Sequence, residues 1–245
     1  MQAFHGDISI KCRYLDRVRA HAVADEIIHG KYWENGKGCA VGCTIHGERH
    51  MDYESELGIP VMLARLEDRL FEGQSNGKSK AFPERFLVAA KVGADLSRVG
   101  WKFLYWLLTE ELASRDDPRV ARQIKRCADV LIPLTKGEPV NREEALAAMR
   151  EARSAAAAAY DADAYAYAAA ASAAYAADAA DAAADASADA AADAASAADA
   201  AASAAYADAA DAARSACYER MAEKLLELMS ECDGEPHRVA WGMVA

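Results

Sequence analysis

Residues 154–216 read SAAAAAYDADAYAYAAAASAAYAADAADAAADASADAAADAASAADAAASAAYADAADAARSA. Of these 63 residues 41 are alanine, and the others are aspartate, serine, tyrosine and a single arginine. Alanine has the highest helix propensity because it loses no side-chain entropy in a helix, so the segment is predicted to be helical. Each buried methyl group contributes at most about 0.8 kcal/mol, so stable packing requires a helical neighbour.

The helical region is predicted to extend beyond this segment on both sides. Neither glycine nor proline occurs between Pro139 and Gly234. Asn141 is a predicted N-cap, and two glutamates follow it in the first turn, where the helix dipole favours acidic side chains. As one straight rod, residues 141–232 would be about 135 Å long.

Two arrangements of the region are compatible with the sequence. In the first, one long helix carries a continuous polar stripe. In the second, the chain breaks near residues 161–167, 185–189 and 206–208 and forms antiparallel helices of about 20 residues, packed alanine against alanine. Domain compactness and usual helix lengths favour the second arrangement.

The polar residues of the region form an acidic stripe. At 3.6 residues per turn most of them fall in one sector about 140° wide. Residues 154–216 contribute −9 to the formal net charge of −11. Such a stripe repels the phosphates of nucleic acid. It is complementary to a basic protein surface, including one that normally binds nucleic acid. The competing explanation is that the aspartates only keep an alanine helix in solution. The predicted partner-binding residues are Asp178, Asp181, Asp185, Asp189, Asp193 and Asp199.

The composition indicates a cytoplasmic protein. The first residues, MQAFHGDISIKCRYL, lack the apolar core of a signal peptide, and the aspartates of the alanine-rich segment exclude a membrane span. The six cysteines do not form a secreted-type framework. The alanine faces also offer a surface for homo-oligomerisation.

The predicted fold class is all-α. An N-terminal helical domain (residues 1–137) packs against the alanine-rich helical region (residues 138–233), and residues 234–245 form a tail. Within the first domain, residues 8–12 are expected to form a short strand and residues 15–29 a helix. A further helix is expected to begin at Pro118 and to end before Pro133.

One constellation in the first domain has the residue types for metal chemistry. Cys39, Cys43, His46 and His50 form a C-x3-C-x2-H-x3-H pattern in a glycine-rich loop. Two sulfurs and two imidazoles suit tetrahedral zinc, although the spacing is short for four ligands. A cysteine–histidine nucleophile and a purely structural role for the buried thiols are the alternatives, so the cofactor is either none or Zn²⁺.

Three segments carry a resemblance to a known family. They are YWENGKGCAVGCTIHG (residues 32–47), YESELGIPVMLARLEDRLFEG (residues 53–73) and MAEKLLELM (residues 221–229), which follows the alanine-rich run. Together they resemble a family of bacterial and phage-borne proteins for which no activity is established. The resemblance implies a bacterial or phage setting, in which small acidic proteins are often inhibitors or immunity factors.

Three functions follow as hypotheses from different classes. The first is a non-enzymatic binding protein, such as an inhibitor, anti-defence or immunity-type factor, that presents its acidic helical face to a basic protein partner. The second is a metal- or thiol-dependent enzyme centred on the loop from Cys39 to His50. The third is a protein that sequesters a small ligand between its two regions. The residues favour the first.

Overall fold

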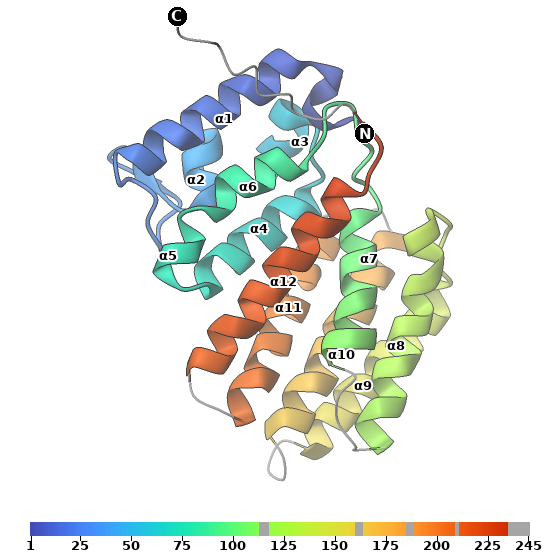
Figure 1. Ribbon diagram of the computed structural model, residues 1–245. Helices are drawn as coiled ribbons and strands as arrows, with labels where there is room; N and C mark the ends of the chain where they lie inside the picture. The colour runs from blue at the N-terminus through green and yellow to red at the C-terminus, as the bar shows by residue number, and fades with distance from the viewer. Residues whose placement is uncertain (113–117, 160–163, 185–188, 209–210, 235–245) are drawn as a thin grey trace, which may run out of the picture.

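The computed structural model describes residues 1–112, 118–159, 164–184, 189–208 and 211–234 (Figure 1). Regular structure in these residues is helical apart from one pair of two-residue strands, which confirms the all-α prediction. None of the described helices is both long and apolar enough to span a membrane.

The first part of the chain forms short helices around a small hairpin, in which β1 runs antiparallel to β2. Figure 1 shows these elements in blue to green on one side of the molecule. They are the 3₁₀ turn η1 (Ala3–Gly6), α1 (Ile8–Val23), β1 (Trp33–Glu34), β2 (Lys37–Gly38), α2 (Ala40–Ile45), α3 (Asp52–Leu57), α4 (Val61–Gly73), α5 (Asn76–Ser79) and α6 (Phe82–Ala89).

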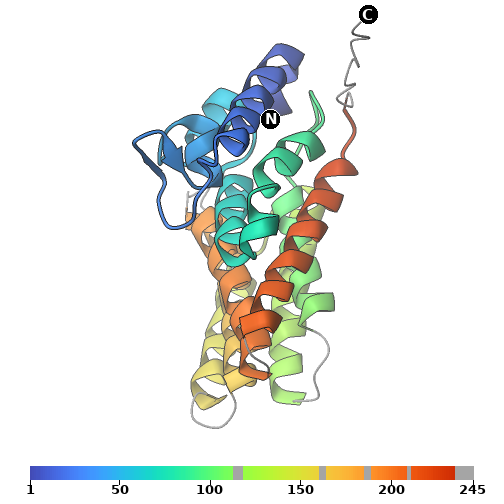
Figure 2. The same ribbon diagram turned by 60° about the vertical axis from the view of Figure 1, so that its left-hand side comes forward.

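The second part is built from longer helices that lie side by side. Figure 2 shows the alanine-rich helices, yellow to orange, extending away from the blue N-terminal helices. The elements are α7 (Val99–Trp106), the π-helical turn η2 (Leu107–Glu111), α8 (Pro118–Lys136), α9 (Arg142–Ala159), α10 (Ala164–Ala184), α11 (Asp189–Asp208) and α12 (Asp211–Ser230).

The expected strand at residues 8–12 is wrong, because these residues begin α1. The Asp7 side chain accepts a hydrogen bond from the backbone N–H of Ser9 at 2.8 Å and so caps the helix. The expected stop before Pro133 is also wrong, since α8 continues to Lys136. Pro133 lies in the last turn, where its missing N–H removes one intrahelical hydrogen bond and the helix ends three residues later.

The alanine-rich region is a set of packed helices, as in the favoured arrangement. Helix α10 lies between α9 and α11 and also contacts α8. Most alanines of α10 and α11 are buried, since methyl groups allow the helix axes to approach closely. Ser172 is also fully buried, and its hydroxyl donates a hydrogen bond across to the Ala197 carbonyl at 2.8 Å. Asn141 caps α9 as predicted, accepting hydrogen bonds from the N–H groups of Glu143 and Glu144.

Large side chains of the first part cover the alanine-rich helices. Helix α4 packs against α11 and α12, and α12 also contacts α6 and α7. The buried apolar residues of both parts belong to one continuous core. Gly73 shows how closely α4 and α12 approach, because a Cβ atom at this position would lie 2.2 Å from the Tyr218 ring.

Candidate functional site

The first candidate site lies on α9, α10 and α11 and contains three of the predicted aspartates. Asp178 of α10 pairs with Arg153 of α9 at 2.6 Å. Asp189 and Asp193 come from α11. Partial burial, together with the negative charges of Asp178 and Asp189, raises the pKa of Asp193 to about 6. The carboxylates of Asp178 and Asp189 therefore act on Asp193, and the charge of Arg153 offsets part of their effect.

An open groove lies between α9 and α10, and Arg153, the ion-pair partner of Asp178, is one of its lining residues. It has a volume of about 570 Å³ and is lined by Arg153, Tyr167, Tyr175 and alanines of both helices. Tyr167 and Tyr175 are 39% and 38% exposed, so aromatic faces are presented to solvent two helical turns apart. We call Arg153, Tyr167, Tyr175, Asp178, Asp189 and Asp193 the acidic–tyrosine surface.

The other predicted aspartates are placed differently. Asp181 pairs with Arg142 at 2.9 Å, and its side chain is only 15% exposed. Asp199 lies on the side of α11 that faces α4 and α12. Asp185 lies outside the described residues. The acidic stripe is thus divided, and three of its members, Asp178, Asp181 and Asp199, form ion pairs inside the molecule.

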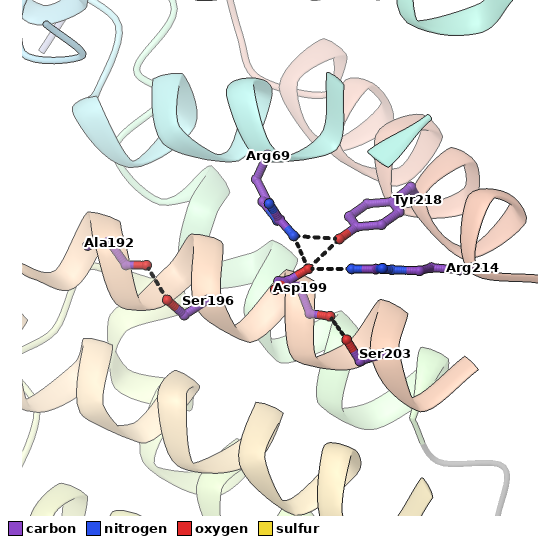
Figure 3. A network of polar contacts seen from close by, with 7 residues as sticks. All are labelled: Arg69, Ala192, Ser196, Asp199, Ser203, Arg214 and Tyr218. Atoms are coloured by element: carbon purple, nitrogen blue, oxygen red, sulfur yellow. Dashed lines mark hydrogen bonds and ion pairs between the residues drawn. The ribbon is translucent and has the colours of Figure 1, made fainter. Parts of the chain in front are cut away.

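Asp199 is the centre of a polar network that joins three helices (Figure 3). Its Oδ1 atom accepts hydrogen bonds from Arg69 of α4, from Tyr218 of α12 at 2.6 Å and from Arg214 of α12 at 3.2 Å. Burial opposes the charge of Asp199, but the hydrogen bonds from Tyr218 and Arg69 outweigh it and lower the pKa of this carboxyl. A small cavity of about 190 Å³ adjoins both arginines.

The serines near this network are satisfied locally. Ser196 and Ser203 donate to the carbonyls of Ala192 and Asp199 within α11, at 3.1 and 3.0 Å. Such bonds to the preceding turn are usual for serine inside a helix. Figure 3 shows both serines pointing along α11, away from Arg69 and Arg214, so they take no part in the arginine–aspartate contacts.

The four residues of the predicted zinc pattern do not converge on one point. Cys43 is buried and its thiol donates to the Gly38 carbonyl at 3.3 Å. The Nε2 atom of His46 lies 2.8 Å from that of His21, and the His46 ring stacks on Trp33 at 4.4 Å. His50 lies 3.3 Å from a carboxylate oxygen of Asp68.

The Cys39 side chain instead lies close to two carboxylates of α4. The Cys39 Sγ atom, one oxygen of Asp68 and one oxygen of Glu72 all lie within 4.8 Å of one another. Among the described residues, these three form the group whose ligand atoms are close enough to hold a metal ion. Burial, followed by the charge of Asp68, raises the pKa of the Cys39 thiol. Burial also raises the pKa of Glu72. A thiolate nucleophile at Cys39 is therefore disfavoured.

Asp68 and Glu72 are not among the site residues that the sequence predicted. Their spacing of four residues places both on one face of a helix, which is a usable signal. What the sequence does not reveal is that the loop after α1 brings Cys39 to that face.

The chain matches no protein-family model, and no curated protein or solved structure is significantly similar to it. The resemblance of residues 32–47, 53–73 and 221–229 to bacterial and phage-borne proteins therefore stays a prediction.

Proposed function

We propose that this protein is a non-enzymatic binding protein whose acidic–tyrosine surface docks a lysine- or arginine-rich segment of a protein partner. The observation that carries the proposal is that the groove adjoins Asp178 through Arg153, and that the charge of Asp178 also acts on Asp193. Arg153 makes this link, since it lines the groove and pairs with Asp178.

The chemistry of the surface suits a basic side chain. A guanidinium placed over Tyr167 or Tyr175 gains a cation–π contact, and its aliphatic stem packs on alanine methyl groups in the groove. A cation near Asp193 offsets the repulsion from Asp178 and Asp189 that the free protein carries. The carboxylates also accelerate encounter with a basic partner, an effect that salt weakens.

This form of binding suits an inhibitor of the immunity or anti-defence kind. A protein whose target binds nucleic acid has a basic surface, and an acidic helical face of rigid alanine helices is able to occupy it. The acidic–tyrosine surface would then compete with the phosphates of the target's own ligand.

The experiment compares two triple variants with the same net charge. In one, Asp178, Asp189 and Asp193 become Asn. In the matched control, the exposed residues Asp16, Glu48 and Asp233 become Asn, Gln and Asn. An arginine-rich peptide is titrated into each protein at low and at physiological salt.

We expect the surface variant to bind the peptide at least about tenfold more weakly at low salt and the control to bind like the wild type, since steering charges act locally. Physiological salt should reduce the difference. If both triple variants lose affinity equally, only the overall charge matters and the proposed surface is wrong.

A further inference from the structure

A second cluster of ionisable groups lies away from the acidic–tyrosine surface, where the loop after α1 meets α4. Cys39 precedes α2, and Asp68 and Glu72 are one turn apart on α4. Their potential ligand atoms lie within 4.8 Å of one another. Ligand atoms around Zn²⁺ are roughly 3–4 Å apart, so a small contraction brings these three to bonding distance of one ion.

Neighbouring donors hold the two carboxylates in place. The backbone N–H of Gly30 donates to both oxygens of Glu72, at 2.9 and 3.0 Å. The Tyr32 hydroxyl donates to Oδ2 of Asp68 at 3.2 Å, and Nε2 of His50 lies 3.3 Å from the same atom. Both contacts engage Oδ2 of Asp68, and the Cys39 thiol is itself hydrogen-bonded to this carboxylate. Hydrogen-bonded carboxylates of this kind are typical of metal ligands.

His29 supplies an independent observation. Its Nε2 atom is shielded from solvent and has no hydrogen-bond partner among the described residues. The ring packs edge-on against Phe71 at 4.8 Å and lies close enough to Glu72 to act on it electrostatically. A shielded imidazole nitrogen without a partner is uncommon, and this one lies near the Glu72 carboxylate of the cluster.

We infer that Cys39, Asp68 and Glu72 bind a divalent transition-metal ion of the Zn²⁺ class, with His50 as a positioning residue. One sulfur and two carboxylate oxygens form a three-ligand donor set that zinc accepts. On binding, the Cys39 thiol gives its proton to solvent and the sulfur–metal bond forms. The site shares only Cys39 with the C-x3-C-x2-H-x3-H pattern.

The test titrates Co²⁺ and then Zn²⁺ into the full chain after chelator treatment, and follows the near-ultraviolet charge-transfer absorption of a thiolate–cobalt bond. We expect one equivalent to bind and Zn²⁺ to displace the cobalt. Cys39→Ser should abolish the absorption. Asp68→Asn and Glu72→Gln should weaken binding more than about tenfold, and His50→Gln should weaken it by about 10–100-fold.

Cys43→Ser is the matched control, because it removes another buried thiol of the same loop; it and His46→Gln should leave the absorption unchanged. Thermal unfolding without metal checks that each variant folds. If Cys39→Ser does not fold, the two nearly isosteric carboxylate variants decide the test. Absence of stoichiometric binding, or loss of the absorption in Cys43→Ser with retention in Asp68→Asn, would overturn the inference. Neither result bears on the acidic–tyrosine surface.

Discussion

At the scale of single residues, Asp193 shows that a carboxylate on a helix surface need not have an ordinary pKa. Its environment contains Asp178 on α10, Asp189 on α11 and Arg153 on α9. Partial burial and two like charges outweigh the arginine, so the pKa rises from 3.8 to about 6. Because the folded-state pKa exceeds the unfolded one, ionised Asp193 destabilises the fold at neutral pH.

Asp193→Asn is therefore expected to stabilise the protein at pH 7. The shift corresponds to about 3 kcal/mol for a fully buried group, and solvent screening of this partly exposed carboxylate reduces the gain to about 1 kcal/mol. The wild type takes up a proton between pH 6 and 4, so the gain should disappear over that window. Urea unfolding of both proteins at several pH values measures it; a gain that persists at pH 3.5 would contradict the explanation.

At the scale of elements, the polar network of Asp199 stabilises the packing of the alanine-rich helix α11 against α4 and α12. The burial of alanine methyl groups contributes little packing energy to α11. Arg69 of α4 and Tyr218 of α12 add hydrogen bonds to its Asp199 side chain. The sequence predicted Asp199 as a partner-binding residue, because the helical period indicates which face of a helix a residue occupies. The period does not reveal which neighbouring helix covers that face.

Asp199→Asn should cost about 1–2 kcal/mol of unfolding free energy at pH 7. It weakens charge-assisted hydrogen bonds from two arginines, and partial exposure limits the loss. Since the pKa of Asp199 is lowered in the folded state, its contribution is present above about pH 4 and is lost as the pH falls through the folded value.

Chemical unfolding should thus show the same difference in unfolding free energy between wild type and Asp199→Asn from pH 7 to about pH 4. Below about pH 4 this difference should become smaller. Ser203→Ala is the control on the same helix, because it removes one bond to the Asp199 carbonyl and leaves the carboxylate in place. If the control costs as much as Asp199→Asn, the network does not stabilise the packing of α11.

At the scale of the whole molecule, the alanine-rich region folds back on itself. Helix α9 ends at Ala159 and α10 begins at Ala164, α10 ends at Ala184 and α11 begins at Asp189, and α12 begins at Asp211. Scattering in solution should give a radius of gyration of about 18 Å, the value for a compact chain of this length. A rod of about 135 Å would give roughly twice that radius, and such a result would contradict the fold.

The all-α class and the cap at Asn141 could be predicted from the sequence, because alanine propensity and capping are local properties. The predicted breaks are less exact, since α10 already begins at Ala164 and α11 continues through residues 206–208. The start of α1 could not be predicted, because residues 8–12 have a strand-like pattern that conflicts with the N-cap signal of Asp7. The convergence of Cys39 on Asp68 and Glu72 depends on tertiary packing between segments about 30 residues apart. Spacing within one loop cannot reveal such a meeting.

The uniform packing faces of α10 and α11 have a further consequence. A helix covered with identical methyl groups is able to slide along its neighbour by one turn, about 5.4 Å, and meet nearly the same surface again. Contacts between alanines therefore specify poorly which register is correct. The polar contacts supply that information: Ser172 with Ala197, Arg153 with Asp178, and Asp199 with Arg69 and Tyr218 each exist at a single offset. In this protein a few polar side chains select one alignment among many that the alanines alone would make almost equal in energy.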